Sequence, residues 1–333
     1  MGNVRIFGII KIKLKYGFER YYKKEILEEY HCFEKVDRVS KDDATTNFKR
    51  RARYQQALWR EKNNLPFGSQ PYIDKGESHK MGSRIDYNHA KNNMSNFLTP
   101  AVKKAVSNRI NNPEPKQMFR KDRLYADCLS SMPMCFNLFG LVSDDMAKAT
   151  KAVKEWWPDT PGKVTNIRFE WSPGRGIKGR FLENRSAFDV AFELELENGS
   201  KGLIGIETKY HEDCKKEKLS KKERVDRYKL VSDKSGVFIP DYLDKILGTE
   251  LQQIWQDHIL ALSMKQDNES NWDWVKFVLV YPSKNPSFKK AAEKYASILD
   301  NKETFEAKTI ESILSSSVID KKDIEVFRDR YIW

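Results

Sequence analysis

The sequence predicts an α/β protein in which helices flank a mixed central sheet and a basic, mostly helical region precedes that core. Residues 143–283 read as helix, strand, hairpin, helix and strand, which is the element order of an α/β core. Of the 333 residues, 39% are hydrophobic, enough to bury a sizeable core in one large or two ordinary domains. We therefore expect a basic region at 1–142 and an α/β domain at 143–333.

Positive charge is concentrated in the first of these regions. Residues 1–142 hold 27 Lys and Arg against 15 Asp and Glu, whereas residues 143–333 hold 33 of each kind. A general lysine bias is the alternative explanation, but it would not leave the second region neutral. The asymmetry favours a polyanionic partner, and we expect the N-terminal region to bind nucleic acid.

The N-terminal region is expected to combine helices with loops. A strand-like run, Val4–Leu14, opens it, and the Pro and Gly residues within 64–118 predict loops. One helix is rich in Lys and Arg, which can lie along phosphates. The expected helices are Tyr21–Tyr30, the basic Thr46–Asn63, Pro100–Arg109 and Lys121–Ser131. The apolar run Met132–Phe139 that follows is predicted to be buried.

The centre of the second region is a hairpin at residues 187–212. Its first half alternates apolar and polar residues with period two, and Asn198-Gly199-Ser200 supplies a turn. Glu207 and Lys209 are two apart on the second strand and share a face, while Asp189 lies on the polar face of the first. The hairpin can thus gather two carboxylates and an ammonium, a site for a divalent cation and an activated water. The alternative is an amphipathic hairpin whose charged face is solvated.

Helices and strands on both sides of the hairpin complete the predicted core. Ser143 is expected to cap a helix that ends at Trp157, and Thr249–Gln252 reads as the capping box of a crossover helix. His258 lies on the apolar stripe of that helix and is predicted to be a core histidine. The other expected elements are strands at Lys163–Trp171 and Lys276–Tyr281 and helices from Pro286, near Thr309 and at Lys321–Tyr331.

Asp189 on one strand and Glu207-Thr208-Lys209 on the next resemble the signature of the PD-(D/E)XK nuclease superfamily. The resemblance covers the Asp, the Glu-x-Lys and the hairpin between them, and the residue before Asp189 is Phe188 and not Pro, a departure that many members share. It implies a restriction-endonuclease-like core that hydrolyses phosphodiester bonds with Mg²⁺ or Mn²⁺. Asp189, Glu207 and the carbonyl of Thr208 would hold the metal, and Lys209 would orient the attacking water.

The same resemblance implies two further site residues. Superfamily members often take an additional acidic ligand from the first helix or first strand, which makes Glu155 and Glu170 the candidates, and we prefer Glu170. Some members place a Gln from the crossover helix at the active site. The capping box explains Gln252, so Gln253 is the expected residue. His211 shares the face of Lys209, where a phosphate contact and a structural hydrogen bond are equally open.

The predicted partner is nucleic acid, with DNA favoured over RNA. The segments Tyr54–Arg60 and Cys135–Gly140 resemble a group of restriction endonucleases in the same superfamily, which implies a role in restriction or anti-phage defence. An RNA-cleaving toxin and a non-catalytic nucleic-acid-binding protein remain alternatives, because backbone contacts by Arg and Lys serve DNA and RNA alike. A double-strand break would favour a homodimer.

Other functional classes are disfavoured. No apolar run is long enough to span a bilayer, so no membrane association is expected. The four cysteines are scattered without a CxxC pair, which argues against a zinc knuckle or a disulfide framework. Reduced thiols fit a cytoplasmic location.

Overall fold

The structure is a computed structural model that describes residues 24–32, 44–69, 80–114, 117, 119–216, 218 and 222–333. Its centre is a five-stranded sheet of order β3-β4-β5-β6-β7. The strands are β3 (Lys163–Trp171), β4 (Phe188–Glu195), β5 (Lys201–Thr208), β6 (Trp272–Tyr281) and β7 (Phe305–Thr309). The β3–β4 and β4–β5 pairs are antiparallel, whereas β5–β6 and β6–β7 are parallel, which confirms the predicted mixed sheet.

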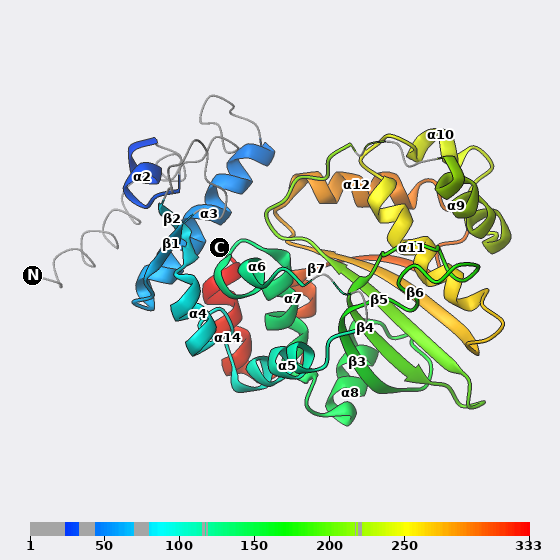
Figure 1. The fold of residues 1–333 in the computed structure, drawn as a ribbon, viewed down its shortest axis with the longest axis horizontal. Coiled ribbons are helices and arrows are strands. Elements are labelled where there is room, and N and C mark those ends of the chain that lie inside the picture. Colours follow the sequence, from blue (N-terminus) through cyan, green and yellow to red (C-terminus); the bar gives the residue numbers. More distant parts are fainter. Residues whose placement is uncertain are drawn as a thin grey trace, which may run out of the picture.

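Helices cover both faces of this sheet, as expected for an α/β core. The parallel step from β5 to β6 needs a crossover, and the chain makes it through α9 (Lys222–Ser235), α10 (Tyr242–Ile246) and α11 (Gln252–Lys265). Together with α12 (Pro286–Ala296), these helices lie on one side of the strands (Figure 1). The opposite face packs against α7 (Ser131–Phe139), α8 (Met146–Trp156) and neighbouring helices.

The hairpin strands are buried on both faces. Val190, Phe192 and Leu194 lie in one hydrophobic cluster with Ile204 and Ile206 of β5, as the alternation predicts. On the other face, Ala191 and Leu203 are also fully buried, against the crossover helices. The alternation predicts that Phe188 lies on the same face as Val190, but Phe188 belongs to the second cluster. The predicted alternation of faces therefore holds only from Val190 onward.

The N-terminal part contains more regular structure than the sequence predicts. Its elements are α2 (Lys24–Glu29), α3 (Ala44–Lys62), β1 (Phe67–Ser69), β2 (Lys80–Ile85), α4 (Tyr87–Asn93), α5 (Pro100–Asn111), α6 (Lys121–Ala126), α7 and the 3₁₀ turn Gly140–Val142. The strand pair β1–β2 and helix α4 fall within the stretch 64–118 that was expected to be mostly loop. The predicted strand at Val4–Leu14 lies outside the described residues.

Helix α7 is the clearest missed element. The sequence predicts one helix at Lys121–Ser131, but α6 ends at Ala126 and a second helix begins at Ser131. Pro133 is tolerated because it lies in the first helical turn, where backbone N–H groups have no intrahelical partner. Every residue of α7 is buried. A helix that is apolar all round shows no 3.6-residue pattern, which is why the run was recognised only as buried.

The basic residues of α3 are largely internal. Lys49, Arg50, Arg53 and Arg60 are only 3–7% exposed. The Arg60 guanidinium donates to the carbonyl of Gly82 at 2.8 Å and to that of Leu65 at 2.7 Å, and so ties α3 to β2. Much of the positive charge of this helix therefore serves the fold.

The core runs continuously across residue 142. Ala52 and Trp59 of α3 share one hydrophobic cluster with α7 and with Val190 and Ile206 of the sheet. The Arg330 guanidinium, in the C-terminal α14 (Lys321–Tyr331), lies 3.9 Å from the centre of a Trp59 ring. In the described part of the chain, one hydrophobic cluster therefore spans both expected regions.

Two helix starts differ from the prediction. Asp145, not Ser143, caps α8, accepting hydrogen bonds from the amides of Ala147 and Lys148. At α11, the Thr249 hydroxyl accepts from the Leu251 amide and the Gln252 side chain from the Gly248 amide, so both capping-box bonds are displaced by one residue. The helix expected near Thr309 is the short α13 (Ile310–Ile313), preceded by the unpredicted β7.

His258 is buried in α11, as predicted for a core histidine. Its ring nitrogens lie 2.9 Å from the Tyr295 hydroxyl and 2.9 Å from the Thr304 hydroxyl. Burial lowers the pKa of His258 to about 3. The pKa of a histidine in the unfolded chain is near 6.5, so the neutral His258 ring contributes its full stabilisation of the fold above that pH. This contribution to the free energy of unfolding is lost as the pH falls towards 3.

We expect His258→Gln to weaken the acid sensitivity of the fold. Between pH 7 and 4.5 the wild-type protein should lose about 2–3 kcal/mol of unfolding free energy through this residue, because 2 pH units below 6.5 correspond to that amount. The variant lacks the titrating ring and should lose correspondingly less. Urea unfolding at both pH values measures the difference, and equal losses in the two proteins would contradict the assignment.

Among the described residues, no helix combines the length and apolar character needed to cross a membrane.

Candidate active site

The sheet topology brings three acidic residues to one edge. Because β3, β4 and β5 are successively antiparallel, the end of β3, the start of β4 and the end of β5 meet there. Phe169 pairs with Val190, and Val190 pairs with Ile206. One step further along the same registers, Glu170, Asp189 and Glu207 occupy neighbouring positions across three strands. Side chains at directly opposed positions lie on the same side of a sheet.

Asp189 is held by the strand beside it. Its Oδ2 accepts hydrogen bonds from the Thr208 amide at 2.8 Å and from the Thr208 hydroxyl at 2.6 Å. Burial raises the pKa of Asp189, although both hydrogen bonds from Thr208 act to lower it. These bonds leave Oδ1 of Asp189 as the oxygen that can face a cation. The expected role of the Thr208 carbonyl remains a prediction.

Glu207, Lys209 and Gln253 form a closed polar triangle. The Lys209 ammonium lies 2.7 Å from Glu207 Oε1 and donates to Gln253 Oε1 at 3.1 Å. The Gln253 amide donates to the same Glu207 oxygen at 3.2 Å. Gln253 comes from the first turn of α11, so the crossover helix and β5 both contribute. The side chains of Glu207 and Lys209 are each only 12% exposed. This burial contradicts the alternative interpretation of a hairpin with a solvated charged face.

The carboxylates repel one another in a buried setting. Burial raises the pKa of Glu170 to about 8 and that of Glu207 to about 7, and the charge of Asp189 contributes to both increases. Burial alone would lower the pKa of Lys209, but Glu207 and Glu212 more than offset this effect, so its pKa is raised. Lys209 therefore carries its charge at neutral pH, whereas the raised pKa values of Glu170 and Glu207 favour their protonated forms until a cation binds.

This donor set fits a hard divalent cation in its chemistry. Mg²⁺ and Mn²⁺ prefer oxygen ligands, and a cation would relieve the repulsion between these carboxylates. The side chains are not already drawn into a coordination shell: in the part of the chain that the structure describes, no group of three or more His, Cys, Asp and Glu residues is arranged as a metal site. Asp189 is turned to Thr208 and Glu207 to Lys209.

The two candidates for the additional acidic ligand lie in different places. Glu155, at the end of α8, accepts hydrogen bonds from the Ser316 hydroxyl at 2.6 Å and from the Ser317 amide at 2.7 Å. It anchors the chain that leads into α14. Glu170 instead interacts electrostatically with Asp189 and Glu207. The structure therefore brings Glu170, and not Glu155, to the site.

One further carboxylate was not expected from the sequence. Glu212 follows β5, accepts a hydrogen bond from the Tyr210 amide at 2.7 Å and acts electrostatically on Asp189, Glu207 and Lys209. Strand periodicity could not identify it, because the strand ends at Thr208. Nδ1 of His211 lies 3.0 Å from the Leu129 carbonyl. Of the two roles left open for His211, this contact corresponds to the structural hydrogen bond.

A cleft of about 630 Å³ opens beside the triangle. Lys209, Glu212 and Gln253 form part of its wall. The remaining basic residues of the wall are Lys49, Lys215, Lys216 and Lys218. Lys49 comes from α3 and lies 3.4 Å from Asp213, so the N-terminal part of the chain reaches the cleft.

A mixed sheet that gathers an Asp, a Glu and a Lys at one edge, under a crossover helix, defines a nuclease fold. The chain belongs to the PD-(D/E)XK nuclease superfamily, whose family model matches residues 41–333. Members of this superfamily are usually nucleases and generally use divalent metal ions. No curated protein and no solved structure matches the chain.

Proposed function

We propose that this protein is a Mg²⁺- or Mn²⁺-dependent endonuclease that hydrolyses phosphodiester bonds in DNA. The proposal depends chiefly on one observation: Asp189, Glu207 and Lys209 meet in a buried cluster beside a cleft that Lys209 and other lysines line. The lysines of the cleft suit a phosphate backbone, and the carboxylates suit the metal that such hydrolysis needs.

Each residue has a distinct task in this proposal. A divalent cation held by Asp189, Glu207, Glu170 and the Thr208 carbonyl would lower the pKa of a bound water and neutralise phosphate charge. Lys209, which stays protonated, serves as a hydrogen-bond donor to the water and the developing charge rather than as a general base. Gln253 fixes the position of the Lys209 ammonium, and Thr208 fixes Asp189.

DNA is favoured over RNA, with a role in restriction or anti-phage defence in the cytoplasm. This part of the proposal rests on the resemblance of Tyr54–Arg60 and Cys135–Gly140 to restriction endonucleases. A homodimer would suit a double-strand break, since each copy carries one cluster. An RNA-cleaving toxin and a non-catalytic binding protein make different predictions, and the experiment below separates them.

Metal dependence is the first test. Purified protein is incubated with plasmid DNA and with total RNA, with Mg²⁺, with Mn²⁺ and with EDTA. We expect DNA cleavage with either metal and none in EDTA, because the buried carboxylates need the cation to act on an anionic substrate. Full cleavage in EDTA would contradict metal dependence. Cleavage of RNA alone would favour the toxin, and binding without cleavage would favour the non-catalytic protein.

The lysines of the cleft are expected to supply DNA affinity. The double variant Lys215→Ala and Lys216→Ala should bind DNA more weakly, and the slope of log affinity against log salt should fall by about 0.9 for each phosphate contact removed. Lys62→Ala with Lys80→Ala removes two exposed lysines that do not line the cleft and serves as the matched control. Point changes are preferable to deleting residues 1–142, because the core crosses that boundary. A greater loss of DNA affinity in the control variant would indicate that the N-terminal region supplies most of the affinity.

A further inference from the structure

Glu170 has an unusual backbone for a strand residue. Its φ is +51°, in the left-handed region that side chains other than glycine avoid. The residues on either side remain in the sheet, since Phe169 pairs with Val190 and Trp171 pairs with Phe188. The distortion is therefore confined to the residue that carries the additional carboxylate.

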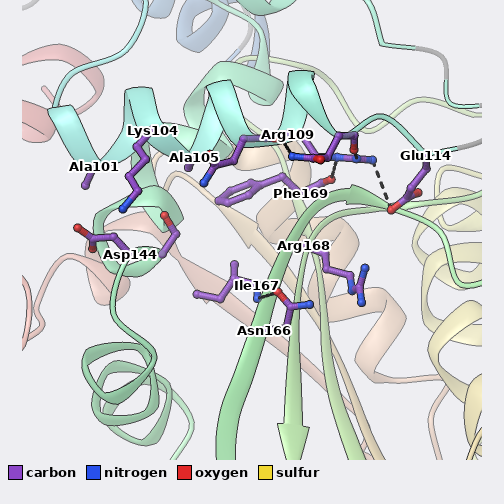
Figure 2. A pocket seen from close by; sticks show the side chains of 13 residues that line it. Ala101, Lys104, Ala105, Arg109, Glu114, Asp144, Asn166, Ile167, Arg168 and Phe169 are labelled. Atoms are coloured by element: carbon purple, nitrogen blue, oxygen red, sulfur yellow. Dashed lines mark hydrogen bonds and ion pairs between the residues drawn. The ribbon is translucent and has the colours of Figure 1, made fainter.

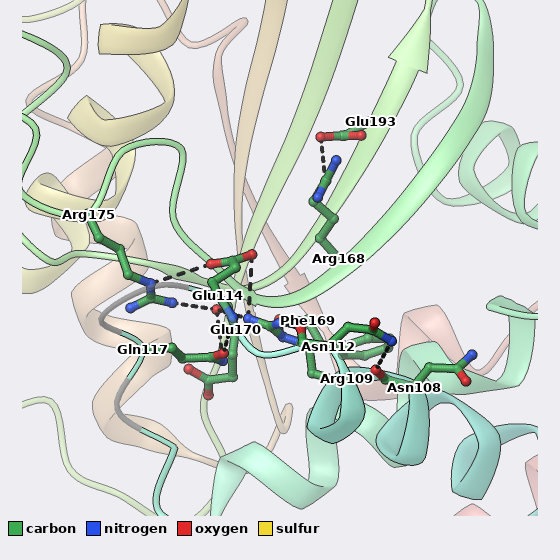
Figure 3. Close-up of polar contacts among 10 residues, drawn as sticks. All are labelled: Asn108, Arg109, Asn112, Glu114, Gln117, Arg168, Phe169, Glu170, Arg175 and Glu193. Carbon is green, nitrogen blue, oxygen red and sulfur yellow. Dashed lines mark hydrogen bonds and ion pairs between the residues drawn. The ribbon is translucent and has the colours of Figure 1, made fainter.

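Two arginines hold this distorted backbone. Arg175 donates from Nη2 to the Glu170 carbonyl at 2.7 Å, and Arg109 donates from Nη2 to the same oxygen at 3.3 Å (Figure 3). Arg109 also donates from Nε to the Phe169 carbonyl at 2.6 Å. Gln117 adds a longer contact of 3.5 Å to the Glu170 carbonyl. A carbonyl that accepts from three side chains is turned towards these donors and away from the strand ladder.

Glu114 joins the two arginines. Its Oε1 lies 3.4 Å from Arg109, and its Oε2 lies 3.4 Å from Arg175. The side chains of Arg109 and Arg175 are each only 10% exposed. Burial lowers the pKa of Arg109, so keeping this charge inside costs energy. Both arginines, which are largely buried, contact the Glu114 carboxylate and donate to the Glu170 carbonyl. They are therefore not ordinary surface ion pairs.

Arg109 borders a cavity of about 350 Å³ between α5 and β3 (Figure 2). Arg109, Glu114 and Phe169 are among the residues that line it. A shorter side chain at Arg109 leaves space that water can occupy, because the site is polar and roomy. Conservative variants of Arg109 are therefore expected to fold.

We propose that Arg109 and Arg175, joined through Glu114, are positioning residues for Glu170. Their hydrogen bonds keep the Glu170 backbone in its left-handed conformation and so direct its carboxylate towards Asp189 and Glu207. The inference rests on the proposed function, in which Glu170 is a metal ligand. The arginines act through the carbonyl of Glu170 and take no part in the chemistry.

Metal binding by the metal-free protein is the first readout. Arg175→Lys and Arg109→Lys keep the charge but lose the planar fork that reaches the carbonyls. Each should lower Mn²⁺ affinity by about 10–100-fold in a calorimetric titration, the range for residues that orient a ligand. Arg168→Lys is the matched control, since Arg168 lies on the same strand and pairs with Glu193 rather than with the Glu170 carbonyl. It should bind Mn²⁺ like the wild type. If one arginine variant fails to fold, the other still decides.

A double-variant cycle tests whether the arginines act through Glu170. In a Glu170→Gln background, Arg175→Lys should lower Mn²⁺ affinity no further. In a Glu170→Gly background, Arg175→Lys should also cost less thermal stability than in the wild type, because glycine takes a positive φ without strain. Wild-type Mn²⁺ affinity in both arginine variants, or a full additional loss in the Glu170→Gln background, would overturn the proposal.

The cycle also separates this proposal from the proposed function. If Asp189→Asn abolishes Mn²⁺ binding but Glu170→Gln leaves it unchanged, Glu170 is not a ligand and the positioning role alone is overturned. If Asp189→Asn leaves Mn²⁺ binding intact, the metal site itself is misplaced and the proposed function is overturned with it.

Discussion

Lys209→Ala is expected to lower DNA cleavage by about two to four orders of magnitude, the usual scale for one preorganised electrostatic or proton-transfer group. The ammonium lies 2.7 Å from Glu207 and is held by Gln253, so it is poised beside the carboxylates. Its removal leaves Asp189, Glu170 and Glu207 in place. Mn²⁺ should therefore still bind, and bind as tightly or more tightly, because a repelling positive charge has gone.

Two measurements run side by side would establish this result. Calorimetric titration with Mn²⁺ reports the metal, and plasmid cleavage reports the chemistry. Lys201→Ala is a suitable control, since Lys201 begins the same strand β5 at its far end and is exposed. Wild-type cleavage by a folded Lys209→Ala protein would remove Lys209 from the mechanism and make the Glu-x-Lys match a coincidence.

Asp189→Asn is expected to abolish metal binding and cleavage together. The asparagine carbonyl can still accept the hydrogen bonds that Thr208 donates, so the local structure should persist. The negative charge opposite Glu170 and Glu207 is lost, and with it a cation ligand. We expect cleavage to fall by at least about three orders of magnitude.

The metal-free Asp189→Asn protein should also be more stable than the wild type. Asp189 raises the pKa of both neighbouring glutamates, which means that their negative charges repel one another in the fold. Replacing one buried charge with a neutral amide relieves this repulsion, as is common where function opposes stability. Glu155→Gln is the control carboxylate, because it contacts Ser316 and Ser317 outside the site. It should keep Mn²⁺ binding. An Asp189→Asn protein that binds Mn²⁺ normally would contradict the assigned site.

These two variants also divide the remaining alternatives. A non-catalytic member of the superfamily would bind DNA equally well with or without Lys209 and would show no cleavage to lose. An active nuclease shows separable effects, since Lys209 contributes charge stabilisation and Asp189 contributes the metal.

Local patterns in the sequence predicted the strands that carry the site. The strand Lys163–Trp171 has the predicted bounds, and the period-two alternation around Val190 and Phe192 identifies β4. Both signals are short-range, because successive side chains of a strand point to opposite faces. Helices with one apolar face, such as α12 and α14, were predicted for the same reason.

Patterns of this kind fail where burial is complete or where a fold is assembled from distant segments. Helix α7 is buried all round and shows no periodicity. The strand β7 is only five residues long and gains its place by pairing with β6. The buried lysine and arginines of α3 look in sequence like a surface for phosphates, but their partners, such as the Gly82 carbonyl, lie far along the chain.

The sequence by itself named the side chains that we propose for the chemistry: Asp189, Glu207 and Lys209 from residue type and spacing, and Gln253 from the resemblance to the superfamily. Only the tertiary structure places Glu170, and not Glu155, beside Asp189 and Glu207, because that placement depends on the register of β3 against β4. It also showed Glu212 and the arginines that hold the Glu170 carbonyl. Arg109 and Arg175 lie 66 residues apart and meet only because α5 packs beside β3, a contact between distant segments that no local pattern encodes.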